Sequence, residues 1–286
     1  MKRRSSQHRL LIGLALVAAS IGPAVNADAR RGDRYVAMGD SFTAGPVIPV
    51  QVEPFGCLKS NRNYPNLVAK SLAGRRFRDI SCSGAKTDDL YEPQSIQGGS
   101  NPAQFSALSS RTTVVTLGIG GNDIGFSEII ENCSSADPTA TPCRDHYVVD
   151  GVDEIGRRIR ATAPKIAAAI KAIERRAPNA RVFLVGYPQI LPNTGPGCWP
   201  ILPITEGDVP YLRSKAKQLN SMLRTRAEAA GVGYVNTYGP SRGHSACALP
   251  IKRWVEPLVP TSPAAPVHPN ARGMAGMADV VAAAVR

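Results

Sequence analysis

Residues Arg34-Tyr-Val-Ala-Met-Gly-Asp-Ser-Phe-Thr-Ala-Gly45 set the framework of this chain. The stretch predicts a short apolar strand, Tyr35 to Met38, that ends at Gly39-Asp40-Ser41, and Gly45-Pro46 breaks the chain soon afterwards. A serine in that position lies at the carboxyl end of a strand, where open α/β sheets bind their ligands. Gly, Asp and Ser are also ordinary turn residues, so these three residues indicate a nucleophile only if its partners lie elsewhere in the chain.

The first 27 residues have the three parts of a signal peptide. A basic segment with Lys2 and Arg9 precedes an apolar run from Leu10 to Ile21, and Val25-Asn-Ala27 has the small residues of a cleavage site. The apolar run is too short for a comfortable membrane span. We therefore expect a cleaved signal peptide at 1–27 and a secreted or cell-wall-associated protein; an uncleaved N-terminal anchor is the alternative.

The composition favours a globular protein and gives no sign of a nucleic-acid partner. The 286 residues are 43% hydrophobic and 20% charged, which excludes a disordered chain. Four of the 34 basic residues and none of the 22 acidic ones lie in the signal peptide, so the remainder carries a net charge of +8. Because the basic residues are spread without aromatic interleaving, they predict a solvated surface. Weak peripheral contact with anionic lipid or cell-wall polymer stays open.

Six cysteines remain after the signal peptide, an even number in an exported chain, and they predict disulfide bonds. Six cysteines allow fifteen pairings, and spacing alone does not choose among them. Only Cys143 and His146 have the spacing of metal ligands, and one such pair does not make a zinc site. The cysteines are Cys57, Cys82, Cys133, Cys143, Cys198 and Cys247.

Strands and helices alternate along the chain, which predicts a mostly parallel sheet covered on both faces. Expected strands are 35–38, 77–80, 112–117, 181–186 and 232–236, and expected helices are 64–72, 152–176, 211–230 and a last one from Pro269. Residues 91–103, rich in Gly, Pro, Gln and Ser, predict a surface loop. The fold class is therefore α/β. Because no segment of the sequence has the composition of a linker, we expect one three-layer domain over residues 28–286.

Three of the predicted strands run into unusual turns, at Gly39-Asp-Ser41, Ser83-Gly84 and Gly121-Asn122-Asp123. The carboxyl ends of parallel strands share one edge, so these turns are expected to converge. The last turn lacks the third glycine of a dinucleotide-binding loop, because Asp123 occupies that position, and no P-loop lysine follows. No nucleotide or other cofactor is therefore expected. A fourth element, His268 in Pro266-Val-His-Pro-Asn270, completes a set suited to acyl transfer.

These four segments resemble the conserved blocks of the SGNH or GDSL hydrolases. Gly39-Asp-Ser41 looks like the first block, Gly84 the second, Gly121-Asn122-Asp123 the third and His268-Pro269 the last, in the family's order over residues 39–269. The six cysteines and Trp254-Val-Glu-Pro257 look like its secreted actinobacterial esterase and lipase branch. The resemblance implies a flavodoxin-like five-stranded three-layer αβα fold. It also implies consecutive pairing: Cys57–Cys82, Cys133–Cys143 and Cys198–Cys247.

The resemblance also implies roles for individual residues. Ser41 would be the nucleophile and His268 its general base, since a serine hydroxyl is a weak nucleophile until a base removes its proton. The oxyanion would be held by the N–H groups of Ser41 and Gly84 and by the Asn122 side-chain amide. No metal is implied.

One position departs from the family pattern. The last block usually has an aspartate three residues before the histidine, and Ala265 stands there. No carboxylate lies between Glu256 and His268. Some members of the secreted branch orient the histidine with a main-chain carbonyl, and a carbonyl from around Ala265 would fix the tautomer without offsetting the imidazolium charge. We therefore predict a Ser-His dyad; a hidden triad using an acid such as Glu256 is the alternative.

The sequence thus predicts an exported, monomeric serine ester hydrolase of the esterase or lipase type that acts on small-molecule or lipid esters. A carbohydrate acetyl esterase or a phospholipase stays open, because the loops that build the pocket are not placed by sequence. Tyr187-Pro-Gln-Ile-Leu-Pro192 and Pro200-Ile-Leu-Pro203 are equally consistent with an acyl pocket and with plain loop packing. The alternative from another class is a non-catalytic cell-wall or lipid-binding protein on the same scaffold.

Overall fold

A five-stranded parallel sheet forms the centre of the computed structural model, which describes residues 34–72 and 74–286. The strand order is β11-β10-β7-β1-β4, the flavodoxin-like order of an open α/β sheet. All five strands predicted from sequence are present, so the predicted fold class is confirmed. The predicted signal peptide, residues 1–27, lies outside the described residues. The strands are β1 (Arg34–Gly39), β4 (Arg76–Asp79), β7 (Thr112–Gly118), β10 (Arg181–Val185) and β11 (Gly233–Val235).

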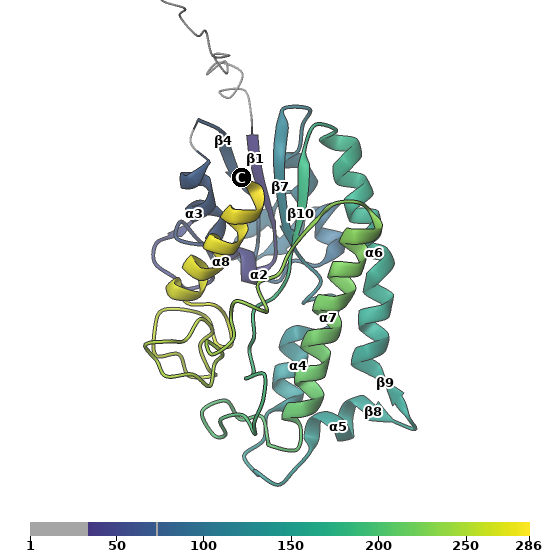
Figure 1. The fold of residues 1–286 in the computed structure, drawn as a ribbon, viewed down its shortest axis with the longest axis vertical. Helices are drawn as coiled ribbons and strands as arrows, with labels where there is room; N and C mark the ends of the chain where they lie inside the picture. Colours follow the sequence, from purple (N-terminus) through teal and green to yellow (C-terminus); the bar gives the residue numbers. More distant parts are fainter. Residues whose placement is uncertain (1–33, 73) are drawn as a thin grey trace, which may run out of the picture.

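Helices cover both faces of the sheet (Figure 1). The long helices α6 and α7 lie together on one face, and α3 and α8 lie on the other. Val114 and Val115 of β7 are both fully buried although they point to opposite faces, as a strand between two helical layers requires. The helices are α2 (Ser41–Ala44), α3 (Tyr64–Ser71), α4 (Phe126–Cys133), α5 (Pro142–Tyr147), α6 (Glu154–Arg176), α7 (Val209–Ala229) and α8 (Ala271–Val285).

The caps of the long helices follow from the sequence. The Asp153 side chain accepts a hydrogen bond from the Gly156 N–H at the start of α6, and Asn270 accepts one from Gly273 at the start of α8. The apolar faces predicted from helical spacing are buried against the sheet. In α8 that face comprises Met274, Met277, Val281 and Val285, each no more than 1% exposed.

The prediction of a surface loop at 91–103 was wrong. That segment forms an antiparallel hairpin of β5 (Gln94–Ile96) and β6 (Gly99–Asn101), and its residues Gln94 and Asn101 are buried. The strands are too short for a period to be visible, and their polar residues are typical of loops. Two further hairpins were also missed, β2 (Gln51–Val52) with β3 (Lys59–Ser60) and β8 (Val148–Val149) with β9 (Val152–Asp153).

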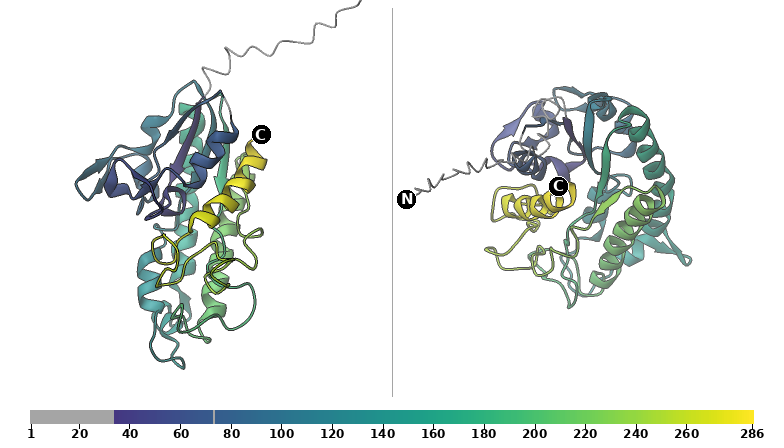
Figure 2. Two further views of the ribbon diagram at one scale, coloured as in Figure 1. Left: turned by 90° about the vertical axis from the view of Figure 1, so that its left-hand side faces the viewer. Right: turned by 45° about the horizontal axis from the view of Figure 1, so that its top comes forward.

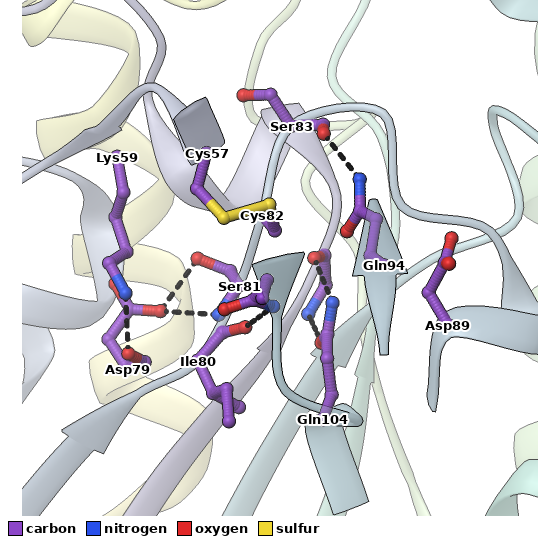
Figure 3. The surroundings of a disulfide bond; sticks show 12 residues. Cys57, Lys59, Asp79, Ile80, Ser81, Cys82, Ser83, Asp89, Gln94 and Gln104 are labelled. Carbon is purple, nitrogen blue, oxygen red and sulfur yellow. Dashed lines mark hydrogen bonds between the residues drawn. A yellow bond between two sulfur atoms is a disulfide. The ribbon is translucent and has the colours of Figure 1, made fainter. Parts of the chain in front are cut away.

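All six cysteines are paired, and the pairing is the consecutive one that the family resemblance implies: Cys57–Cys82, Cys133–Cys143 and Cys198–Cys247. The first bond ties the loop after α2 to the segment that leaves β4 (Figure 3). Cys57 also accepts a hydrogen bond at its carbonyl from the Ser83 N–H, at 3.0 Å. The turn that contains Gly84 is therefore anchored at its start.

The long connection from β11 to α8 folds beneath the carboxyl ends of the strands, where it brings residues from the end of the chain to those that follow β1 (Figures 1 and 2). The Ala265 N–H donates to the Pro46 carbonyl at 3.1 Å across this meeting point. Helix α8 then runs back along the sheet. In the part of the chain that the structure describes, no helix combines the length and apolar character needed to cross a membrane.

Candidate active site

Ser41 is the first residue of α2, and Asp40 alone separates it from the end of β1. The Asp40 carboxylate caps this helix by accepting from the Phe42 N–H at 2.9 Å, and Ser41 is 6% exposed. Gly39 has φ +150°, and a Cβ at this position would lie 2.3 Å from Thr43 Oγ1. Only glycine fits there, so the sharp exit from the strand that presents Ser41 depends on it.

His268 meets Ser41 from the far end of the chain. Its Nε2 lies 2.8 Å from Ser41 Oγ, and its Nδ1 lies 2.7 Å from the Pro266 carbonyl oxygen. The His268 N–H donates to the Ala265 carbonyl at 3.2 Å, which closes a turn with Pro266 and Val267 at its centre. Val267 has φ +60°, a strained value for a β-branched residue, and this backbone turns the Pro266 carbonyl toward the imidazole.

The partners of the imidazole fix its tautomer. A carbonyl only accepts hydrogen bonds, so Nδ1 carries the proton toward Pro266 and the Nε2 lone pair faces the Ser41 hydroxyl. Burial lowers the pKa of His268 below its ordinary value, with the bond to Pro266 acting in the opposite direction. The rings of Phe42 and Phe126 pack against the imidazole, with centroids at 5.0 and 5.6 Å. These surroundings therefore favour the neutral form of the imidazole.

The Glu256 carboxylate is committed to other partners. One oxygen accepts from the Asn270 side-chain amide at 2.6 Å, and the other accepts from the Thr261 N–H at 2.8 Å. Burial raises its pKa, but these hydrogen bonds outweigh burial and the pKa of Glu256 is lowered on balance. The Glu256 N–H donates to the His268 carbonyl at 3.0 Å. Glu256 thus braces the loop that carries His268, while Pro266 occupies Nδ1.

The three turns predicted to converge are joined by hydrogen bonds. The Asp40 N–H donates to the Gly118 carbonyl and the Cys82 N–H donates to the Gly39 carbonyl, both at 3.0 Å. The first bond links the end of β1 to the end of β7, and the second links it to the segment after β4. The carboxyl edge of the sheet therefore brings the predicted residues into one site.

Candidate oxyanion donors lie on these turns. Within the described residues, neither the Ser41 N–H nor the Gly84 N–H donates a hydrogen bond. Asn122 Nδ2 donates to the Ala85 carbonyl at 2.9 Å. An amide nitrogen carries two N–H groups, so one remains for a further acceptor.

Two carboxylates and a tyrosine hold these turns together. The Tyr187 hydroxyl donates to the Asp40 carboxylate and accepts from the Gly121 N–H at 2.8 Å. Burial raises the pKa of Asp40 to about 7, although the bond from Tyr187 acts to lower it. Asp123 accepts from the N–H and the hydroxyl of Thr87. Nothing in the sequence marked Tyr187 as the link between the turns that contain Asp40 and Gly121.

An apolar pocket of about 850 Å³, counting the part open to solvent, adjoins the site. Phe42, Phe126 and Tyr187 belong both to its lining and to the surroundings of Ser41 and His268. The two segments for which an acyl pocket and plain packing were left open both contribute to it. Its further lining includes Ile124, Ile129, Ile130, Ile155, Pro188, Ile190, Leu191, Leu202, Ile204, Leu212, Ala216 and Leu219.

Two further histidines of the described residues, His146 and His244, make contacts away from this site. His146 Nε2 lies 3.3 Å from Asn132 Nδ2, and His244 Nδ1 lies 2.6 Å from the Lys252 carbonyl while its ring stacks on Trp254. Among residues 34–72 and 74–286, no group of three or more His, Cys, Asp or Glu side chains has a metal-binding arrangement.

Comparisons with known proteins show which family and which solved structures the chain is similar to. A family model described as "GDSL-like Lipase/Acylhydrolase family" matches residues 37–275. Lipase 2 of Streptomyces coelicolor is 42% identical over 252 residues, which is 86% of this chain and 83% of that protein. The crystal structure of an extracellular lipase from Streptomyces rimosus has a TM-score of 0.75 at 26% identity and covers 89% of this chain and 100% of its own. The phospholipase A1 structure from Streptomyces albidoflavus NA297 has a TM-score of 0.74 at 26% identity, over 88% and 98%.

Proposed function

Because the chain belongs to the GDSL-like lipase/acylhydrolase family, we propose that it hydrolyses long-chain carboxylic esters through an acyl-enzyme on Ser41. The observation that carries this proposal is the 2.8 Å contact between His268 Nε2 and Ser41 Oγ beside an apolar pocket. A nucleophile, a base held in the right tautomer and a hydrophobic pocket are what ester hydrolysis requires.

Acylation begins when His268 Nε2 takes the proton of the Ser41 hydroxyl as Oγ attacks the ester carbonyl carbon. The carbonyl oxygen becomes negative and accepts hydrogen bonds from the Ser41 and Gly84 N–H groups and from the second N–H of Asn122 Nδ2. The tetrahedral intermediate then collapses, the bond to the alcohol oxygen breaks, and the imidazolium returns the proton to that oxygen.

Deacylation repeats these steps with water in place of Ser41 as the nucleophile. His268 removes a proton from the water, the hydroxide attacks the acyl carbon, and the proton returns to Ser41 Oγ as the fatty acid leaves. The Pro266 carbonyl holds Nδ1–H throughout, so the ring keeps its orientation in every step. A carbonyl dipole stabilises the imidazolium of His268 less than a carboxylate does. The free energy of this imidazolium therefore depends more on cation–π contact with the rings of Phe42 and Phe126.

The pocket supports a lipid ester as the substrate. Its lining is mostly aliphatic and aromatic, with Arg213, Lys215 and Asn220 as its polar members, and burial of each methylene of an acyl chain contributes roughly 0.8 kcal/mol. A lipase and a phospholipase A1 are among the similar structures, and both names refer to acyl esters of lipids. The three disulfides support export, because such bonds persist in oxidising surroundings. We further propose that the protein acts as a secreted monomer that makes peripheral contact with lipid surfaces.

The test is the hydrolysis of p-nitrophenyl esters from two to sixteen carbons by the wild type and by Ala216→Phe. Ala216 lies on α7 and lines the pocket, so a phenyl ring there is expected to lower kcat/KM for long acyl chains by about tenfold or more and to spare the acetyl ester. Ala229→Phe, at the exposed end of the same helix, is the matched control and should leave the chain-length profile unchanged. A preference for acetyl esters that neither variant alters would favour an acetyl esterase instead.

The lowered pKa of His268 predicts the pH dependence of this reaction. Only the neutral imidazole accepts the Ser41 proton, so kcat/KM should fall tenfold per pH unit below the pKa of His268. Because burial disfavours the imidazolium, the midpoint of this acid limb is expected below 6.5. The measurement is kcat/KM from pH 4.5 to 9, with circular dichroism at each pH as the check on folding. A midpoint at or above 7 would contradict the lowered pKa of His268 as the source of the acid limb.

A further inference from the structure

The Gly84 N–H belongs to the central peptide of a tight turn. The Ala85 N–H donates to the Cys82 carbonyl at 3.2 Å, so the turn runs from Cys82 to Ala85 with Ser83 and Gly84 at its centre. Gly84 has φ +80°, whereas Ser83 is not among the residues with positive φ. This combination defines a type II turn.

The peptide between Ser83 and Gly84 has two accessible orientations. Type I and type II turns share the same end residues and differ mainly in the torsions on either side of their central peptide, which points in opposite directions in the two types. The Ser83 carbonyl and the Gly84 N–H lie on opposite sides of one planar trans peptide. A flip would therefore place a carbonyl oxygen where the N–H had been, and a carbonyl repels an oxyanion.

Gln94 contacts the carbonyl side of this peptide. Its Nε2 donates to the Ser83 carbonyl oxygen at 2.8 Å, and the side chain extends from β5 toward the turn (Figure 3). Gln94 is 8% exposed, so its rotamer is restricted by packing. An ideal Cβ on Gly84 would lie 3.5 Å from the same nitrogen, so the amide lies directly beside the turn.

We infer that Gln94 is a positioning residue for the oxyanion hole: it holds the Ser83–Gly84 peptide in the orientation that directs the Gly84 N–H away from β5 and toward the developing oxyanion. The inference rests on the proposed function, in which that N–H is a donor. The start of the turn is already fixed, because Cys57 accepts from the Ser83 N–H and is disulfide-bonded to Cys82. The torsion of the central peptide is what remains for Gln94 to set.

Two further carboxamides of the segment 94–104 also form hydrogen bonds with the main chain near the site. Asn101, the register partner of Gln94 on β6, donates to the Ile80 carbonyl at 3.3 Å. Gln104 accepts from the Gly39 N–H at 2.7 Å and donates to the Gly39 carbonyl at 2.9 Å. Segment 94–104 thus fixes the main chain ahead of both Ser41 and Gly84. Only Gln94 touches a peptide whose N–H is a proposed oxyanion donor.

The experiment compares Gln94→Met with Asn101→Leu. Methionine keeps the length of glutamine and removes the donor, so kcat is expected to fall about 10- to 100-fold with KM changed less than threefold, a part of what one oxyanion donor contributes. Affinity for an alkyl boronic acid, whose adduct with Ser41 carries an oxyanion, should fall in the same proportion. Asn101→Leu removes another buried carboxamide from the same hairpin and should lower the melting temperature while keeping kcat within threefold.

Gln94→Glu keeps the shape and replaces the donor by a carboxylate, and it is expected to lose at least as much kcat as Gln94→Met. It also keeps the test decisive if the methionine variant does not fold. The inference is overturned if a folded Gln94 variant keeps the wild-type kcat, or if Asn101→Leu loses as much kcat as Gln94→Met. Ser41→Ala separates the two proposals: an active Ser41→Ala would refute the proposed function, whereas an inactive one beside a fully active Gln94→Met would refute the role of Gln94 alone.

Discussion

Ser41→Ala is expected to lower kcat for p-nitrophenyl esters by about 10⁴-fold or more, and His268→Ala should lose a similar amount. Alanine at 41 has no oxygen to form the acyl-enzyme, and alanine at 268 leaves the Ser41 hydroxyl without a base at 2.8 Å. Because the two side chains act as one unit, the double variant should lose no more than either single variant. Steady-state kinetics measure all three losses.

Glu256→Gln is the control for this experiment. The substitution keeps the shape of a side chain that holds Asn270 and Thr261, so some stability is expected to be lost while kcat stays within tenfold of the wild type. A folded Glu256→Gln as inactive as His268→Ala would instead establish a hidden triad. Labelling by an alkyl phosphonate, read by mass spectrometry, should modify the wild type and Glu256→Gln but not Ser41→Ala.

The elements that could be predicted are those in which apolar residues follow a clear pattern along the sequence. The strand at 112–118 is apolar and β-branched because both of its faces are buried, and the helices at 154–176 and 271–285 repeat apolar residues every three or four positions. The elements that were missed are short, and their stability comes from tertiary contacts. Hairpin β5–β6 is one such element, because its buried residues Gln94 and Asn101 are polar.

The candidate site was predictable where the chemistry depends on residue type. Ser41, Gly84, Asn122 and His268 were selected by their turns and their order, and the structure brings all four turns to one edge of the sheet. The acceptor on His268 Nδ1 was expected near Ala265 and is the Pro266 carbonyl. That assignment depends on the positive φ of Val267, and valine gives no sequence signal for such a backbone.

The contacts between turns were not predictable for a related reason. Tyr187 joins Asp40 to Gly121 through its hydroxyl, yet in the sequence it is one aromatic residue in a loop rich in proline. Its role depends on where the end of β10 lies relative to β1 and β7. The pocket likewise takes its lining from four separate helices and the loops between them, so its size is a property of the folded chain.

Asn122→Leu is expected to lower kcat by about 10²- to 10³-fold, the loss typical of one oxyanion donor, with a smaller change in KM. Leucine has nearly the shape of asparagine but offers no N–H, so the charge on the tetrahedral intermediate loses a donor that the ground-state ester uses weakly. Asn122→Asp should lose more, because an ionised carboxylate at this position repels the oxyanion and also the Ala85 carbonyl that Asn122 now holds. The measurements are kcat, KM and affinity for the alkyl boronic acid.

The neighbouring Asp123 provides the control that separates donation from bracing. Asp123→Asn retains an oxygen that accepts from the Thr87 N–H, so the turn stays in place and kcat is expected to stay within tenfold of the wild type. If bracing the turn were the whole role of Asn122, substitutions at 122 and 123 would lower the melting temperature and kcat in parallel. If Asn122 is an oxyanion donor, kcat and boronate affinity fall together in Asn122→Leu, and they fall far more than in an Asp123 variant of similar melting temperature, because the bond to the oxyanion exists only while the intermediate does.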